Sequence, residues 1–344
     1  MTNILYAMNK IFLHTILTLL GLLLYSCTQD DFDSEFKDVE GAIPFHVGEL
    51  ATRGFVDNLA TEGTELCIYG YHDSNVLAAD KTYPLAGKSL TCLDGFWTVV
   101  DNGTPVTYYW EGEGEYRFFG WLKKDGAGLS APTSNWTSTY DSSTKKLTLT
   151  ATLNKDYNQF DFLYSGVDYR NMTPTQKDRS TVEMNMSHLF AAFSVGFINN
   201  SAFPVTIQSI SLNGLRQQGS ATIDFSQNST AVAYSLSAAA TFVTRSANDV
   251  ITGNTTVSNV FNPAAAQPYY MVWPQTINAA SLTITYAIDG NAPATKTLLL
   301  AQEDWEAGKK YDYNIKLDAY GITIEATAWE EPTVNDFIIT TTPS

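Results

Sequence analysis

The sequence predicts an all-β protein built from sandwiches of antiparallel sheets. Beyond the first forty residues, most windows alternate between apolar and polar residues or form short β-branched runs, and Gly, Asn, Asp or Pro bounds them. Aromatic residues make up 13% of the chain and charged residues only 16%, a balance that favours packed β-structure over disorder. Short strands separated by frequent turns are typical of β-sandwiches.

Residues 1–26 have the pattern of a signal peptide. An apolar run from Ile11 to Leu24 follows Lys10 and is too short to span a bilayer comfortably. Both Met1 and Met8 are candidate start residues, and the sequence leaves this choice open.

The apolar run ends in the sequence LYSC, which resembles a bacterial lipobox and closes at Cys27. A small residue directly before the cysteine favours cleavage at this point and lipidation of Cys27. The alternative is a plain signal peptide with an incidental cysteine. Each buried methylene of a lipid contributes about 0.8 kcal/mol, so several acyl chains would tether the chain firmly to a membrane. The acidic residues 28–41 that follow predict a solvated tether.

The rest of the chain divides into two β-rich blocks of similar length. The polar segment 171–180 separates them, so we expect domains at 54–175 and 176–330 and a tail at 331–344. At the start of the second block, the pattern also allows a short helical turn from His188 to Ala192. Strands are predicted at 65–72, 105–110, 116–122, 145–153, 204–212, 221–225, 268–274, 281–288, 295–301, 311–317 and 322–329.

The sequence offers no defensible set of residues for catalysis. Its four histidines lack metal-ligand spacing, and His188 lies among apolar residues as a packing histidine would. Acidic clusters occur at 111–115, 303–306 and 330–331, but such clusters arise by chance among 36 acidic residues and predict solvated turns. A net charge of −16 argues against a nucleic-acid partner. We therefore expect no enzyme, no metal and no cofactor.

Two further features leave alternatives open. Cys67 and Cys92 could form a disulfide in an exported protein, but the apolar run 66–71 favours a buried free thiol at least equally. Large aromatic side chains could stack against sugars if exposed, although packing in a core is their default in strands. These aromatic residues are Trp97, Tyr108, Tyr109, Trp110, Phe118, Phe119, Trp121, Tyr269, Tyr270 and Trp273.

Four stretches, taken in order, resemble the fimbrillin family of Bacteroidales-type bacteria, which comprises type V pilus subunits and their accessory proteins. They are the lipobox with residues 45–54, the segment 181–200 with 205–214, the segment 268–276, and the segment 305–331. The acidic residues after Cys27 are also similar to the signals of surface-exposed lipoproteins in such bacteria. The resemblance covers most of the mature chain.

This resemblance implies two transthyretin-like antiparallel β-sandwich domains in tandem. In the family, a trypsin-like protease cuts after an arginine early in the mature chain, and loss of the N-terminal strand opens a groove. The C-terminal segment of a neighbouring subunit fills that groove. Arg53 and Gly54 match the cleavage position, although Arg245 stands in a similar local sequence. An anchor subunit of this fold would stay uncut.

The sequence holds candidates for both strands of this exchange. Within the N-terminal propeptide at 27–53, Ile43, Phe45 and Val47 alternate onto one side, which suits a displaced strand at 42–51. The tail residues 333–342 are β-prone and would form the donor strand, with an edge strand of their own domain as the alternative. Its candidate residues are Val334, Phe337, Ile338 and Ile339.

We therefore expect a structural or adhesive fimbrial subunit, exported as a lipoprotein and matured after Arg53. Its expected partners are other pilin subunits, the outer membrane through the lipid on Cys27, a trypsin-like protease, and surface ligands of host or bacterium. The expected location is the outer-membrane surface and, after maturation, the fimbrium. The alternative is a surface glycan-binding lipoprotein of a polysaccharide-uptake system, which solvent-facing aromatics in a shallow groove would favour.

Overall fold

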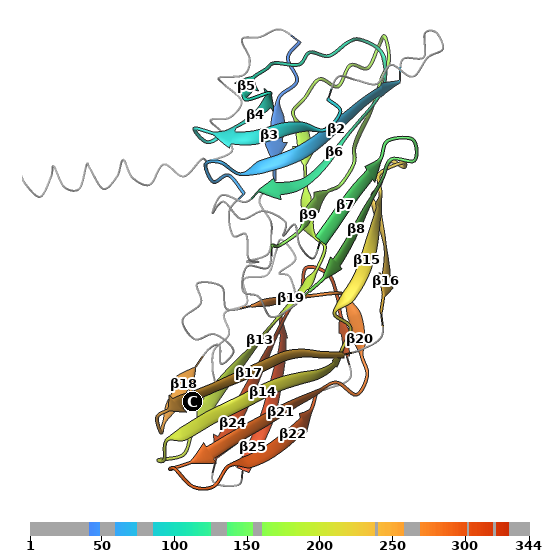
Figure 1. Cartoon of the computed structure of the whole chain (residues 1–344). Coiled ribbons are helices and arrows are strands. Elements are labelled where there is room, and N and C mark those ends of the chain that lie inside the picture. Colours follow the sequence, from blue (N-terminus) through green and yellow to red (C-terminus); the bar gives the residue numbers. More distant parts are fainter. Residues whose placement is uncertain are drawn as a thin grey trace, which may run out of the picture.

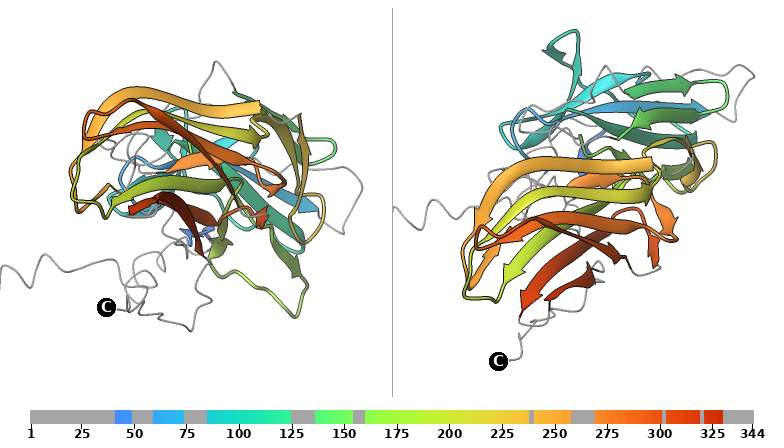
Figure 2. Two further views of the ribbon diagram at one scale, coloured as in Figure 1. Left: turned by 90° about the horizontal axis from the view of Figure 1, so that it is seen from below. Right: turned by 60° about the horizontal axis from the view of Figure 1, so that its bottom comes forward.

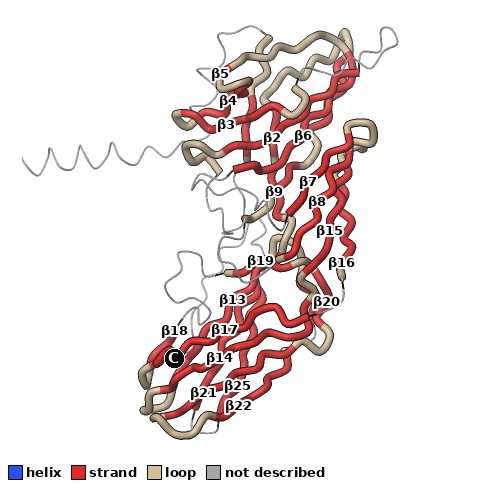
Figure 3. Tube along the Cα trace, viewed as in Figure 1, coloured by secondary structure: helices blue, strands red, loops and turns tan. Residues whose placement is uncertain are grey.

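The computed structural model describes residues 41–48, 59–73, 85–124, 136–153, 160–237, 240–257, 269–300, 303–318 and 321–329. These residues form 25 strands and no helix, so the predicted all-β fold is confirmed (Figure 3). In this described part of the chain, no helix is long and apolar enough to cross a membrane.

An eight-stranded sheet forms one end of the molecule (Figure 1). Its strand order is β12-β9-β6-β2-β3-β4-β5, and β10 pairs with the first half of β6. The strands are β2 (Glu65–Asp73), β3 (Lys88–Leu93), β4 (Phe96–Asp101), β5 (Thr104–Pro105), β6 (Gly114–Lys124), β9 (Leu163–Ser165), β10 (Asp168–Met172) and β12 (Met186–His188).

A four-stranded sheet with the order β16-β15-β8-β7 packs on the eight-stranded sheet. Its strands are β7 (Trp136–Asp141), β8 (Lys146–Thr152), β15 (Gln218–Asp224) and β16 (Ala231–Leu236). The ring of Phe225, just after β15, stacks on Phe119 of β6 at a centroid distance of 4.3 Å. Strands β7 and β8 precede the boundary predicted at residue 175 and β15 and β16 follow it, so the strand pairing of this sheet crosses that boundary.

Two facing sheets form the other end of the molecule, and Figure 2 shows them as two layers. One has the order β18-β13-β24-β25, with β19 also paired to β13, and the other has the order β17-β14-β21-β22. Apolar side chains of both sheets join one hydrophobic core. The strands are β13 (Ala191–Asn199), β14 (Val205–Leu215), β17 (Ala240–Ile251), β18 (Thr255–Val257), β19 (Tyr270–Val272), β21 (Ser281–Ile288), β22 (Ala294–Leu299), β24 (Lys310–Asp318) and β25 (Gly321–Trp329).

Two small ladders complete the described strands. Strands β20 (Gln275–Ile277) and β23 (Glu303–Trp305) pair antiparallel, and β1 (Phe45–Val47) pairs parallel with β11 (Val182–Met184). Along the chain, β1 and β11 lie far apart, and their ladder has only three residue pairs.

Strand β24 has the side-chain pattern expected from its sequence. Tyr311, Tyr313, Ile315 and Leu317 are buried, and the residues between them are half-buried. Gly308 adopts a φ of 77° in the turn before the strand, a conformation that favours glycine. Trp305 closes this corner of the core because its Nε1 donates to Tyr313 Oη at 3.0 Å.

Two local expectations were wrong. The residues from His188 to Ala192 form no helical turn, because β12 ends at His188 and β13 starts at Ala191 after a bend. The bend is fixed by the amide of Leu189, which donates to the carbonyl of Phe162. The window 105–110 is not a continuous strand either, because β5 ends at Pro105 and the later residues hydrogen-bond to the segment that precedes β1.

Candidate functional site

Residues 41–48 form the part of the predicted N-terminal propeptide that the structure describes. Ile43, Phe45 and Val47 are 6%, 4% and 3% exposed, whereas Pro44 and His46 between them are half-buried. The chain therefore presents one apolar face to the core, in the alternation that a strand requires. Arg53 and Gly54 lie outside the described residues, as do Cys27 and the tail residues Val334, Phe337, Ile338 and Ile339.

The pocket that receives Phe45 is aromatic. Phe45 meets the ring of Phe118 edge-on at a centroid distance of 5.9 Å, and Trp110 meets the same ring edge-on at 5.7 Å. Tyr116, the next inward residue of β6, stacks parallel to Phe118. Edge-to-face contacts of this kind add to the free energy of burial, so Phe45 is the main anchor of the segment.

Hydrogen bonds hold the segment on two sides. On one side, Ile43 N donates to Tyr108 O at 2.8 Å, and Trp110 N donates to Gly41 O at 2.9 Å. On the other side, Val182 N of β11 donates to Pro44 O at 2.9 Å. The side chains add an ion-pair contact of 2.7 Å between His46 Nδ1 and Glu183 Oε2.

Side-chain burial contributes more to this docking than the short ladder does. Full burial of an apolar side chain is worth roughly 1.5–3 kcal/mol, and three such side chains point inward here. A typical hydrogen bond contributes about 1 kcal/mol net, and an exposed ion pair such as the one between His46 and Glu183 less than about 1 kcal/mol. A strand that carries equivalent apolar side chains could therefore replace this one.

A buried arginine lies on the far side of β11. The guanidinium of Arg170 makes two parallel hydrogen bonds to Asp168, from Nε to Oδ1 and from Nη2 to Oδ2, both 2.8 Å long. Nη1 also donates to the carbonyl of Ser180 at 2.7 Å and reaches Oδ1 of Asp178 at 3.4 Å. The side chains of Arg170 and Asp168 are 6% and 11% exposed, so this pair is largely removed from water.

The electrostatics of this cluster favour its charged forms. Burial disfavours the charged guanidinium, but the hydrogen bonds and the charge of Asp168 outweigh it and raise the pKa of Arg170. The hydroxyl and the amide of Ser180 donate to Asp178, and with the charge of Arg170 they lower the pKa of that carboxyl. Arg170 and Asp178 are therefore both charged near neutral pH.

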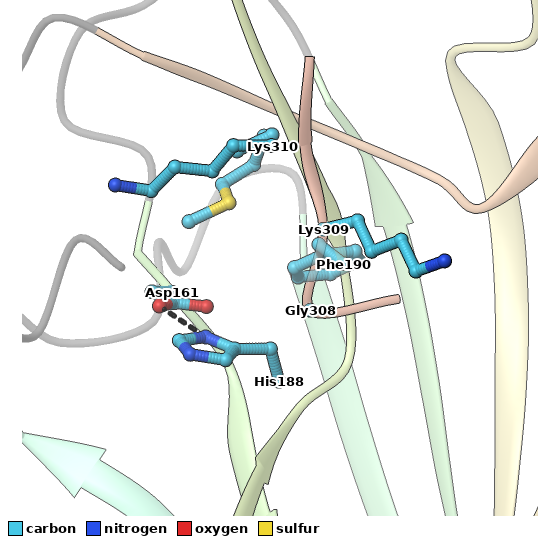
Figure 4. A pocket seen from close by; sticks show the side chains of 8 residues that line it. Asp161, His188, Phe190, Gly308, Lys309 and Lys310 are labelled. Atoms are coloured by element: carbon cyan, nitrogen blue, oxygen red, sulfur yellow. Dashed lines mark hydrogen bonds and ion pairs between the residues drawn. The ribbon is translucent and has the colours of Figure 1, made fainter. Parts of the chain in front are cut away.

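A buried hydrogen-bonded pair lines a small hollow, which Figure 4 shows at close range. His188 Nδ1 and Asp161 Oδ2 are 2.7 Å apart, and both side chains are buried. Among the described residues, Asp161 Oδ1 has no hydrogen-bond partner. The hollow offers about 10 Å³ to a water-sized sphere, which is room for about one water molecule but not for a substrate.

The other candidate chemical groups are dispersed. The ring of His72 stacks on Tyr116, and its Nε2 lies 3.0 Å from the carbonyl oxygen of Glu113. Of the glutamates at 111–115, Glu115 lies in β6 and pairs with Arg117 at 3.0 Å. Among the described residues, no group of three or more His, Cys, Asp or Glu side chains could hold a metal ion.

The predicted aromatic set does not form an exposed platform. Seven of its ten members are buried, Tyr108 and Tyr269 are half-buried, and only Tyr109 is exposed, at 48%. The default of core packing therefore holds for this set, and its members form no exposed surface of the kind that the glycan-binding alternative requires.

Cys67 and Cys92 do not form the disulfide that the sequence left possible. Cys92 is buried, and Cys67 is partly buried beside Trp121 on the neighbouring strand. Burial raises the pKa of Cys67 to about 11, so its thiol stays protonated and unreactive near neutral pH.

Sequence reasoning missed the partners of the N-terminal segment. Nothing in the local sequence marks β11, Asp168 or Arg170, because a parallel ladder between distant segments leaves no short-range signal. Only the structure shows that Arg170 occupies a buried site within β10, between half-buried Tyr169 and exposed Asn171.

Comparison with known proteins finds similarities that cover most of the chain. The family model described as fimbrillin-like matches residues 52–336. A fimbrial protein from Bacteroides vulgatus is similar in structure, with 15% identity, a TM-score of 0.56, and coverage of 84% of this chain and 99% of that chain. A protein from Bacteroides ovatus named for a proposed role in cell adhesion has 15% identity, a TM-score of 0.49, and coverage of 83% and 95%. Among curated proteins no match was found.

Replacing Phe45 by alanine should loosen β1, because it empties the aromatic pocket against Phe118. We expect the Val182 amide, which donates to Pro44, to exchange with deuterium at least about tenfold faster. His46→Ala is the matched control, since it removes only a partly exposed ion pair and should change this rate by less than about fivefold. Equal rates in the two variants would contradict the role assigned to Phe45.

The Asp178 carboxylate should stabilise the protein only above acidic pH. Its pKa is lower in the folded state than in the unfolded state, so its contribution is complete above pH ~4 and is lost as the pH falls through the lowered pKa. Urea unfolding at pH 7 should show Asp178→Asn less stable than wild type, and the difference should shrink at pH 3. An unchanged difference at both pH values would show that ionisation of Asp178 is not involved.

Proposed function

The chain belongs to the fimbrillin-like family, and on that premise we propose that it is a fimbrial subunit that polymerises by exchange of its N-terminal strand. The family and the similar fimbrial structure support a pilus subunit or adhesin at the cell surface. The proposal adds that cleavage after Arg53 releases residues 42–51 and that a second subunit fills the vacated groove.

The observation that carries this proposal is the way in which β1 is bound. Three inward side chains are almost completely buried, yet the strand contributes only a three-residue parallel ladder at the edge of β11. Removal of such a strand leaves unpaired backbone groups along β11 and an empty aromatic pocket beside Phe118. An edge of this kind binds any extended segment that restores both the ladder and the burial.

The C-terminal tail has a suitable sequence for the incoming strand. Phe337 and Ile339 alternate as Phe45 and Val47 do, so a tail in the same register would place an aromatic ring where Phe45 lies. Burial of several side chains at roughly 1.5–3 kcal/mol each would make the joint slow to open.

The N-terminal features complete the proposed route. Lipidation of Cys27 would bring the precursor to the outer membrane, and the acidic residues after it would act as a solvated tether. A trypsin-like protease would then separate this anchor, together with β1, from the body of the subunit. The proposed partners are further copies or other pilin subunits, with adhesion to host or bacterial surface ligands as a role of the assembled fimbria. We propose no enzymatic activity.

Limited trypsin digestion of purified protein that begins at Thr28 tests the maturation step. We expect a cut after Arg53, followed by ladders of polymers that resist SDS, and Arg53→Ala should remain monomeric. Arg245→Ala is the matched control, because residue 245 lies inside β17, paired with Ile210, and should not be cut. A digest that spares Arg53, or a clipped wild type that stays monomeric, would contradict a polymerising stalk subunit.

The donor strand is tested by two neighbouring substitutions in the tail. Phe337→Asp should abolish polymerisation of the clipped protein, because it places a charge in an apolar pocket. Ile338→Asp is the control, since residue 338 faces the opposite side of an extended strand and should retain most polymerisation. If both variants polymerise like wild type, the tail is not the donor strand.

A further inference from the structure

We propose that Arg170 and Asp168 form a clamp that keeps β11 in place as an acceptor edge when β1 leaves. This inference rests on the strand exchange proposed above and makes Arg170 a positioning residue for it. The ligand of the edge is an extended segment of a second subunit with apolar side chains at alternate positions, which takes the place of β1.

Strand β11 is held from two opposite edges. On one edge it pairs with β1, its only ladder partner within the described part of the chain. Successive backbone amides of a strand point to opposite edges, and the amide of Glu183 points away from β1. That amide donates to Asp168 Oδ2 at 2.8 Å. If β1 leaves, this hydrogen bond would remain and would still hold β11 at its opposite edge.

Arg170 fixes the carboxylate that receives this bond. Its guanidinium meets Asp168 with two parallel hydrogen bonds, a geometry that sets the orientation of the carboxylate as well as its distance. Both side chains are largely buried, so water does not compete strongly for them. Asp168 can therefore hold the Glu183 amide in one position.

The same guanidinium holds the chain that leads into β11. Nη1 donates to the carbonyl and to the hydroxyl of Ser180, at 2.7 and 3.0 Å, and Nη2 donates to the carbonyl of Thr181. The strand starts at the next residue, Val182. Arg170 thus fixes the approach to β11 directly and β11 itself through Asp168, and neither set of contacts involves β1.

The clamp gives the vacated edge a defined shape. Without it, a strand of three residues that has lost its ladder partner would become mobile, and an incoming strand would have to order it again at an entropic cost. A pre-ordered edge removes that cost from the binding step. Lysine cannot replace Arg170 in this role, because an ammonium group lacks the planar fork that binds a carboxylate and two carbonyls together.

The test measures exchange of the Glu183 amide in uncut protein beginning at Thr28, with single-amide resolution. Phe45→Ala loosens β1, and Arg170→Lys opens the clamp. Each single variant should raise the exchange rate of Glu183 modestly, because the other edge still holds the strand. The double variant should exceed the product of the two single effects by about tenfold or more, as expected for the loss of charge-assisted hydrogen bonds.

Arg117→Lys is the matched control for the clamp variant. Arg117 also pairs with an acidic residue two positions away, at 3.0 Å, but none of its identified contacts is to β11. Combined with Phe45→Ala, it should give only the product of the single effects. Should Arg170→Lys fail to fold, Asp168→Asn serves as the second variant, because it keeps the shape of the side chain and removes its charge.

Two outcomes would overturn the proposal. One is a double variant in which the Glu183 rate is simply the product of the single effects, and the other is an equal effect of the Arg117 control. Because these measurements use uncut protein, they do not depend on cleavage or polymerisation. Failure of clipped wild type to polymerise would reject the strand exchange, and with it the acceptor role of β11, but not the hold of Arg170 and Asp168 on this strand. Absence of coupling at Glu183 would reject that hold and leave the strand exchange standing.

Discussion

Strand β6 carries large apolar side chains on both faces, and both faces must be shielded from water. This constraint determines what packs on either side of the eight-stranded sheet. Phe118 and Phe119 are consecutive, so they point to opposite sides of the sheet, and both are essentially unexposed. On one side Phe118 packs against Phe45 of the N-terminal segment. On the other side Phe119 packs against Phe225 of the four-stranded sheet. Loss of either cover would expose aromatic surface, and the hydrophobic effect opposes that exposure.

This double cover makes the proposed release of β1 compatible with a stable body. The four-stranded sheet covers its face with strands from two distant parts of the chain, so it cannot leave without unfolding the protein. The N-terminal segment covers the opposite face with the eight described residues 41–48. Its inward side chains are almost completely buried, but one cut in the chain would detach it from the body of the protein. After a cut on its C-terminal side, another molecule could supply the cover. The face of β6 that carries Phe118 would still have to be shielded from water.

Local features of this design could be predicted from sequence, whereas long-range partners could not. The alternation of Ile43, Phe45 and Val47 and that of Tyr311, Tyr313, Ile315 and Leu317 are properties of single strands, and each appears as expected. The parallel pairing of β1 with β11 joins residues 137 positions apart, as His46 and Glu183 show, and no local rule contains it. Nothing in the local sequence distinguishes Arg170, because only the folded chain brings Asp168 and the carbonyls of Ser180 and Thr181 around it. The window 105–110 was misjudged for the same reason, since its backbone bonds to residues 41–43 across the fold.

The four-stranded sheet also determines how the subunit would respond to a pulling or bending force. Its β8–β15 ladder runs over seven residue pairs, from Thr152 with Gln218 to Lys146 with Asp224. Near one end of this ladder Trp273 Nε1 donates to Gln217 O, and near the other Phe225 stacks into the eight-stranded sheet. A torque between the two ends of the molecule would therefore act on many parallel hydrogen bonds at once instead of on a flexible linker. A filament of such subunits would be made of stiff segments, and its compliance would come from the joints between neighbouring copies.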